Sequence, residues 1–117
     1  SMKASMKAQR LMLLSQVHGV TVARADFALD DGVVLNAGLL ESAGFVEHEK
    51  VDVYCLESGA RLSCAVRSGD CARDEVEVGG AAAHLLKPGA KLVISAFGWL
   101  KSKQAAKHRP TRVRVDE

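Results

Sequence analysis

The stretch that decides the fold is Val78-Gly79-Gly80-Ala81-Ala82-Ala83-His84, followed by Leu85-Leu86-Lys87-Pro88-Gly89-Ala90 and Lys91-Leu92-Val93-Ile94-Ser95-Ala96-Phe97. Two glycines release the backbone from steric limits, and three alanines add little bulk, so another segment or a small ligand can approach closely. Proline and glycine form a turn after them. We predict a strand end, a glycine turn, one short helical turn, a loop and a buried strand. Taken alone, the stretch also fits a tight packing corner without a ligand.

Other short elements lie on both sides of this stretch. Residues 11–23 alternate loosely and predict two strands or one bent strand, and residues 33–35, 75–78 and 111–115 predict short strands, the last at an edge. Asp30-Asp31-Gly32 is a turn signal. Many short strands with few helical patterns favour a small all-β barrel with short helices.

Two short helices are expected. Asn36 is a suitable N-cap for a helix over residues 37–43, and Gly44 is a suitable C-terminal stop. Residues 101–107 predict a second, exposed helix.

Residues 51–67 predict a hairpin with the loop Glu57-Ser58-Gly59-Ala60, which places Leu56 opposite Arg61 and Val53 opposite Cys64. One face of this hairpin is apolar and contains Val51, Val53, Cys55, Leu62, Cys64 and Val66. The other face is polar and contains Asp52, Tyr54, Arg61, Ser63 and Arg67. The clean division between the faces indicates that the apolar one is buried.

Size and composition fit one modest globular domain. The chain has 117 residues, of which 48% are hydrophobic and only 4% aromatic. The repeated Ser-Met-Lys-Ala suggests that residues 1–8 are a tag remnant, which leaves residues 9–117 as the domain. No apolar run approaches the roughly 20 residues needed to span a membrane, and no signal-peptide pattern is visible. Three cysteines form no spaced framework, which favours reduced thiols in a cytoplasm.

Charge is unevenly distributed. Residues 1–100 have ten basic and twelve acidic side chains, and residues 101–117 have six and two. Without interleaved aromatic residues, the basic tail is expected to be a solvated face rather than a nucleic-acid site. The four histidines and three cysteines have no metal-ligand spacing, so no metal site is expected.

Gly-Ala-Ala-Ala-His, followed by Pro-Gly and Val-Ile-Ser-Ala-Phe, resembles the aspartate 1-decarboxylase family of small pyruvoyl enzymes that make β-alanine. The resemblance extends without a gap from about residue 11 to residue 115. It takes in Val22-Ala23-Arg24-Ala25-Asp26, Ser42-Ala43-Gly44-Phe45, Val51-Asp52-Val53-Tyr54, Ser58-Gly59-Ala60-Arg61-Leu62-Ser63 and His108-Arg109-Pro110. The resemblance implies a double-psi β-barrel and a homotetramer with sites between subunits.

The family's chemistry depends on a Gly-Ser bond that cleaves itself and turns the serine into the pyruvoyl group. In this sequence the ungapped position contains Asp31-Gly32. Glycine has no hydroxyl to attack the preceding carbonyl, so the resemblance predicts an uncleaved chain without a pyruvoyl cofactor.

Other family positions have also changed. The family's lysine, cleavage-loop tyrosine, site tryptophan, processing threonine, proton-donor tyrosine and asparagine fall on Gln16, Leu29, Tyr54, Cys64, Ala65 and Gly79. The position that holds the substrate carboxylate is retained as Arg61, and His18 and the backbone of residues 80–82 are retained with it.

A carboxylate- or acyl-binding pocket is therefore expected. Its predicted ligand-binding residues are Arg61, Tyr54, Gln16, Gly80, Ala81 and Ala82. The backbone N–H groups of the glycine turn would hold a second oxygen, and Tyr54 would form an aromatic wall. Arg61 also fits a solvated hairpin position.

Candidate catalytic residues are Asp31, His18 and Cys64. Each has a structural alternative. Asp31 fits a turn former, His18 fits a structural hydrogen-bond partner, as does His84, and Cys64 fits a small buried residue.

Three functions follow from these residues. The first is an uncleaved decarboxylase-like protein that binds a small carboxylate or acyl ligand, with or without cofactor-free acid–base chemistry in specialised metabolism. The second is a regulatory subunit of a competent homologue. The third, disfavoured by Gly32, is true aspartate decarboxylation.

Overall fold

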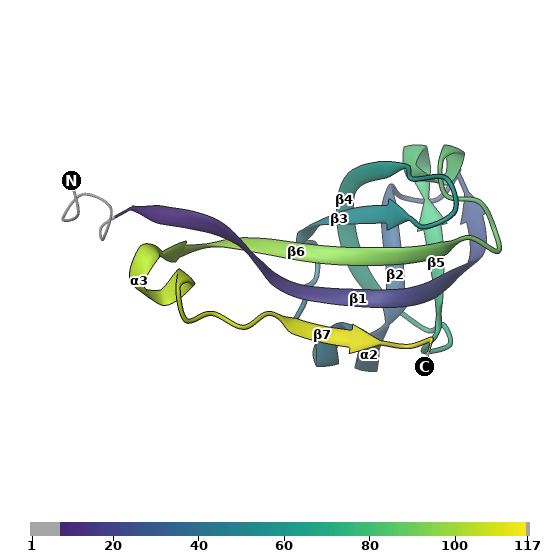
Figure 1. Ribbon diagram of the computed structural model, residues 1–117. Helices are drawn as coiled ribbons and strands as arrows, with labels where there is room; N and C mark the ends of the chain where they lie inside the picture. The colour runs from purple at the N-terminus through teal and green to yellow at the C-terminus, as the bar shows by residue number, and fades with distance from the viewer. Residues whose placement is uncertain (1–7, 117) are drawn as a thin grey trace.

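One mixed sheet of seven strands forms the body of the protein, in the order β5-β2-β4-β3-β6-β1-β7 (Figure 1). This computed structural model describes residues 8–116. The strands are β1 Gln9–Asp26, β2 Gly32–Asn36, β3 Lys50–Cys55, β4 Arg61–Gly69, β5 Glu75–Gly79, β6 Lys91–Lys101 and β7 Thr111–Arg114. The short helices are α2 Ala37–Ala43, η1 Gly80–His84 and α3 Ser102–Ala105. An additional parallel pairing of β5 with β1 closes six of the strands into a barrel, and β7 remains at the edge. The predicted β-rich barrel with short helices is confirmed.

The barrel interior is filled by aliphatic side chains from every strand of the closed ring. Its largest fully buried members are Leu35, Leu39, Leu86, Leu92, Ile94, Val17, Val20, Val22, Val33, Val51, Val53 and Val66. Most of these residues alternate with less buried ones along β1 to β5, as expected for strands with one face on the core. The first half of β6 is buried at five successive residues, 92–96.

Helix α2 has the predicted caps. The Asn36 side chain accepts a hydrogen bond from the Leu39 N–H at 3.0 Å, and Gly44 ends the helix with φ of 73°. These local signals explain why a helix of only seven residues forms here. The predicted helix over residues 101–107 is too long, because α3 covers only Ser102–Ala105.

The register of the β3–β4 hairpin corrects the prediction by two residues. Tyr54 pairs with Arg61, which the sequence had placed opposite Leu56, and Val53 pairs with Leu62. Because the shift is even, every side chain keeps its predicted face. Val53 is fully buried and Leu62 is partly buried.

The reason for the shift lies in a loop longer than predicted. Residues 56–60 connect the strands, and the Gly59 N–H donates to the Cys55 carbonyl at 2.9 Å. The Glu57 carboxylate accepts from the Lys91 N–H at 3.0 Å, which ties this loop to the start of β6. That tertiary contact has no local sequence signal.

The sequence predicted two strands or one bent strand over residues 11–23, and the structure has one bent strand, β1. Its pairing with β6 shifts between Leu13 and Ser15 and again between His18 and Val20. Gly19, with φ of 97°, supplies the backbone conformation at the second irregularity. The first part of β1 and the last part of β6 therefore leave the barrel together.

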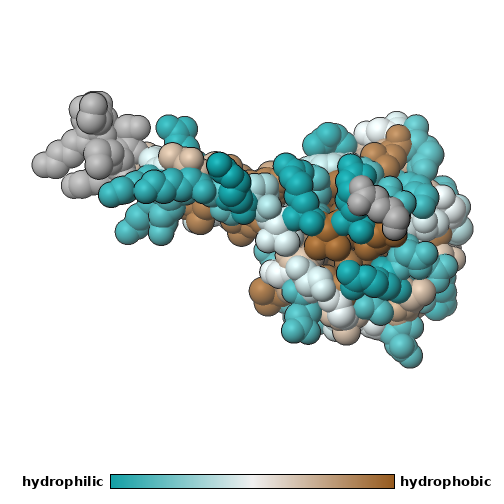
Figure 2. Space-filling view, turned by 60° about the horizontal axis from the view of Figure 1, so that its bottom comes forward, coloured by the Kyte–Doolittle hydropathy of each residue, from teal (hydrophilic) through white to brown (hydrophobic). Residues whose placement is uncertain are grey.

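We call this two-stranded projection the arm; it comprises residues 9–13 and 97–101. It extends to one side with α3 at its tip, and gives the molecule dimensions of 50 × 26 × 25 Å (Figure 1). Figure 2 shows mostly hydrophilic residues over the arm, with hydrophobic residues along its lower margin. The sequence predicted β6 only as far as Phe97, so the arm was missed.

Most of the predicted tag remnant, residues 1–7, falls outside the described residues. Among the helices that the structure describes, none has the length and apolar character needed to cross a membrane.

Candidate functional site

The corrected hairpin register places Tyr54 and Arg61 directly across from each other. The guanidinium carbon of Arg61 lies 3.9 Å from the centre of the Tyr54 ring, which is a cation–π contact. Both side chains line a shallow hollow of about 200 Å³ with Asp52, Leu62 and Ser63. The contact orients the exposed guanidinium over the hairpin surface, where it can hold a carboxylate.

A polar row crosses the sheet beside this pair. Strand pairing aligns Ser63, Asp52, Ser95, Gln16 and Arg112 across β4, β3, β6, β1 and β7. The Gln16 Nε2 donates to the Ser95 Oγ at 3.0 Å, and the Arg112 Nη1 donates to the Gln16 Oε1 at 3.0 Å. These two bonds fix the orientation of the Gln16 amide.

Gln16 therefore lies near the predicted pocket, but both ends of its amide are already engaged by protein groups. Its structural role is to link Arg112 to the fully buried Ser95. Sequence reasoning placed Gln16 from the resemblance and missed Ser95 and Arg112 as its partners, because they lie 79 and 96 residues away.

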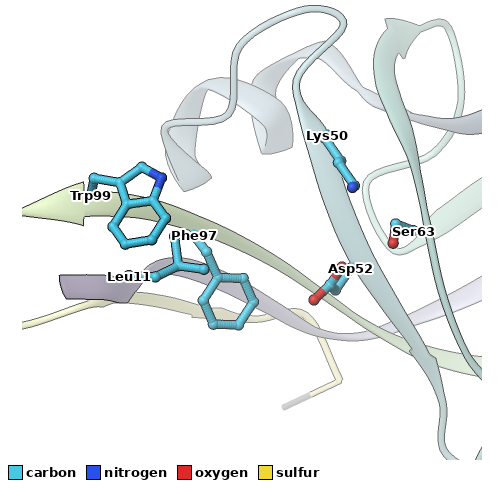
Figure 3. A pocket seen from close by; sticks show the side chains of 6 residues that line it. All are labelled: Leu11, Lys50, Asp52, Ser63, Phe97 and Trp99. Carbon is cyan, nitrogen blue, oxygen red and sulfur yellow. The ribbon is translucent and has the colours of Figure 1, made fainter. Parts of the chain in front are cut away.

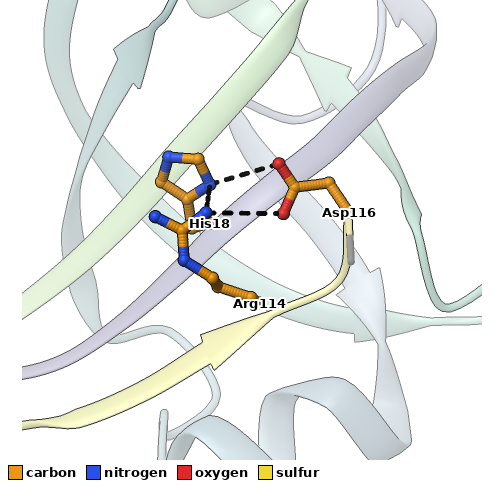
Figure 4. Close-up of polar contacts among 3 residues, drawn as sticks. All are labelled: His18, Arg114 and Asp116. Atoms are coloured by element: carbon orange, nitrogen blue, oxygen red, sulfur yellow. Dashed lines mark hydrogen bonds and ion pairs between the residues drawn. The ribbon is translucent and has the colours of Figure 1, made fainter.

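His18 lies in the next row, where Val93 pairs with both His18 and Tyr54. Its Nδ1 is 3.4 Å from an Asp116 carboxylate oxygen, and the Arg114 guanidinium lies 3.3 Å from the same nitrogen (Figure 4). Arg114 and Asp116 are themselves 3.8 Å apart. The buried Val93 lies on the strand between His18 and Tyr54, so the imidazole is held by the C-terminal segment rather than by the Arg61 hollow.

The carboxylate of Asp31 lies against the backbone of the glycine turn. Asp31 Oδ1 accepts from the Ala82 N–H at 3.3 Å, and a side chain at Gly80 would lie only 2.6 Å from the Asp31 side chain. Gly80 has φ of 67°, so glycine is required there for both reasons. The predicted free N–H of Ala82 is thus already used by Asp31.

A second hollow of about 180 Å³ surrounds this carboxylate. It is lined by Asp31, Leu62, Ser63, Ala81, Ala82 and Leu85. Leu62 and Ser63 line both hollows, so the Arg61 hollow and the Asp31 hollow meet along β4. Arg61, Tyr54 and Asp31, all predicted from the sequence, are brought near one strand segment.

Cys64 is buried on the core face of β4, as the hairpin pattern predicted. Burial, followed by the charge of Asp31, raises the pKa of the Cys64 thiol to about 11. A thiol with that pKa is protonated at neutral pH, so it is a poor nucleophile. The three cysteines are all free.

The structure leaves no space for a side chain at Gly32, the residue that the resemblance aligns with the family's cleavage position. Gly32 begins β2 with φ of 128°, and a side chain there would collide with the Ala65 carbonyl oxygen. The Arg67 guanidinium donates to the carbonyl oxygens of Asp30 and Asp31, at 3.4 and 3.1 Å. Residue 32 therefore has no hydroxyl group and no room for a larger side chain in this conformation.

Comparison with known proteins agrees with this fold. The family described as aspartate decarboxylase matches residues 8–117. The chain belongs to the aspartate decarboxylase family. It is 34% identical to the aspartate 1-decarboxylase of Myxococcus xanthus over 109 residues, which are 93% of this chain and 84% of the relative. It is 37% identical over 108 residues to that of Mycolicibacterium smegmatis, covering 92% and 79%. It is 35% identical over 107 residues to that of Corynebacterium efficiens, covering 92% and 79%.

Family membership confirms the resemblance and the predicted fold class, a barrel of the aspartate-decarboxylase type. The barrel architecture accounts for the meeting of β1, β3, β4 and β6 around the candidate site. Among the described residues, no group of three or more histidine, cysteine, aspartate or glutamate side chains is placed to hold a metal ion.

Proposed function

We propose that this member of the aspartate decarboxylase family is not self-processed and that it binds a small carboxylate or acyl ligand on Arg61. The observation that carries the proposal is the Arg61–Tyr54 contact beside an open hollow, in a chain with Gly32 at the cleavage position. A guanidinium offers two parallel donors, the geometry that suits a carboxylate.

Asp31 is the group we assign to acid–base chemistry on such a ligand. Its carboxylate is exposed, faces the hollow that adjoins the Arg61 hollow, and is held in place by the Ala82 N–H. A positioned carboxylate can take or deliver a proton at a carbon next to the ligand's carbonyl without any cofactor. His18 and Cys64 are less suited, because one is held by Asp116 and the other is a buried, protonated thiol.

Ligand binding is tested by titrating succinate and a malonyl thioester into isotopically labelled protein and following backbone NMR shifts. We expect shifts at Tyr54, Arg61 and Ser63. Arg61→Ala should weaken binding by ten- to a hundredfold, about 1.5–3 kcal/mol for a lost charge-assisted pair. Arg73→Ala, an exposed arginine in the loop before β5, is the matched control. Equal affinity for Arg61→Ala and wild type would overturn the proposal.

Processing is tested separately by intact-mass spectrometry after long incubation at raised temperature. The proposal expects one unbroken chain. Two fragments split before Gly32 would contradict it, and so would β-alanine formation from L-aspartate by purified protein without added cofactor.

A second candidate is a non-catalytic regulatory subunit that joins a serine-containing homologue. Occupation of the Ala82 N–H by Asp31 favours it, since that donor is then closed to a ligand. We expect the chain to form a homotetramer with its sites near subunit boundaries, so mixed tetramers are a natural alternative. Native mass spectrometry after co-expression with a processed homologue decides between homomeric and mixed assemblies. True aspartate decarboxylation, the activity in the relatives' names, is the third and least favoured candidate.

A further inference from the structure

A groove of about 500 Å³ separates the arm from the β3–β4 hairpin (Figure 3). Its two walls differ in chemistry. Leu11, Phe97 and Trp99 project from the arm on one side, and Lys50, Asp52 and Ser63 face them from the hairpin.

The apolar wall is not part of the barrel core. Leu11 is 54% exposed, Phe97 37% and Trp99 65%. Strand pairing puts Leu11 opposite Trp99 and Leu13 opposite Phe97, so these side chains share one face of the arm. A contiguous exposed apolar face is a favourable site for the apolar part of a ligand.

The groove adjoins the Arg61 hollow. Asp52 and Ser63 line both of them, so the two adjoin at these residues. Because Asp52 lines both, it disfavours a ligand carboxylate where they meet, whereas the Arg61 guanidinium offers two parallel donors for one in the hollow. The uncharged part of the same molecule then passes Asp52 and Ser63 and reaches the apolar wall.

We propose that the groove is an acyl-chain subsite, and that the ligand is an amphipathic acid. Its carboxylate binds Arg61, and an aliphatic chain of several carbons lies against Phe97, Leu11 and Trp99. This inference rests on the proposed function and narrows its ligand class from small carboxylates to acids with a hydrocarbon chain.

The chain provides its own reporter, because Trp99 is the only tryptophan. Acetate, butyrate, hexanoate and octanoate are titrated in turn into dilute protein, with affinity measured by calorimetry. Each added methylene should tighten binding about two- to fourfold, since burial of one methylene is worth up to about 0.8 kcal/mol. Hexanoate and octanoate should shift the Trp99 emission to shorter wavelength, and acetate should not.

Phe97→Ala should flatten the dependence of affinity on chain length while acetate binding stays unchanged. Phe27→Ala is the matched control, because Phe27 is a 70% exposed aromatic residue that stacks on His84 and does not line the groove. Arg61→Ala should weaken all four acids by a similar factor.

The possible failures are distinct. Arg61-dependent binding with no gain from chain length overturns the subsite and leaves the proposed function standing. No Arg61-dependent binding of any acid overturns the proposed function and the subsite with it. A Trp99 emission that is already at short wavelength without ligand, and that no acid changes, assigns the apolar wall to a contact between copies of the chain and overturns the subsite.

Discussion

The guanidinium carbon of Arg61 lies over the ring of Tyr54, 3.9 Å from its centre, at the directly paired position of the β3–β4 hairpin. A guanidinium has five N–H donors, so a cation–π contact leaves donors available for an anion. The pair therefore forms a pre-positioned anion binder, and the residue beneath Arg61 helps to set its affinity.

Replacing Tyr54 tests this positioning. Tyr54→Leu should weaken carboxylate binding about two- to fivefold, since an exposed cation–π contact is worth about 0.5–1 kcal/mol. Tyr54→Phe should retain nearly all the affinity, because the ring is kept. Calorimetric titration with hexanoate measures both variants, and an equal loss for the two would assign the effect to the hydroxyl instead.

The two faces of the hairpin predict opposite responses to substitution. Val53→Asp should lower the free energy of unfolding by at least about 3 kcal/mol, because it buries an unpaired charge at a fully buried position. Asp52→Ala should change stability by no more than about 1 kcal/mol, because Asp52 is only partly buried. Urea unfolding followed by circular dichroism measures both; similar losses would argue against the assigned faces.

Restoring a serine should not restore cleavage. Gly32→Ser must fit a side chain against the Ala65 carbonyl at φ of 128°, so it should destabilise the protein by about 1–3 kcal/mol. Intact mass should remain that of one chain. Asp31→Gly combined with Gly32→Ser is the stricter test, and cleavage of this variant would show that only the hydroxyl and its preceding glycine were missing.

The buried thiol of Cys64 should make the folded protein less stable at high pH. Its pKa is raised from 9.0 to about 11 by burial, so the unfolded chain loses this proton first as the pH rises. The stabilisation linked to the protonated Cys64 thiol is complete below pH 9 and is lost between pH 9 and 11. This loss lowers the free energy of unfolding by about 2–3 kcal/mol at most. Denaturant unfolding of wild type and Cys64→Ala across this range isolates the effect, because the other titrating groups are common to both. Parallel curves for the two proteins would contradict it.

Local patterns in the sequence were sufficient for much of the fold. Asn36 and Gly44 specify the ends of α2 through short-range hydrogen bonds and backbone preference, and the structure has both caps. Alternation along β3 and β4 assigned the buried face correctly, because the side-chain period of a strand does not depend on its partner. Gly32 and Arg61 could likewise be singled out from the sequence without coordinates.

Alternation of apolar and polar residues does not determine which residues pair across two strands, and the tertiary structure decided this pairing. A register shift of two residues preserves the faces, so the pairing that sets Arg61 on Tyr54 depended on the bonds of the loop and on its tie to β6 through Glu57 and Lys91. The polar row that contains Asp52 and Arg112 forms because strands far apart in the chain pair with one another. Asp31 likewise bonds to Ala82, which is 51 residues away. The sequence by itself determined which groups are present and which side of each strand they occupy; closure of the barrel determined which of them meet, because contacts across the ring depend on the packing of the whole sheet.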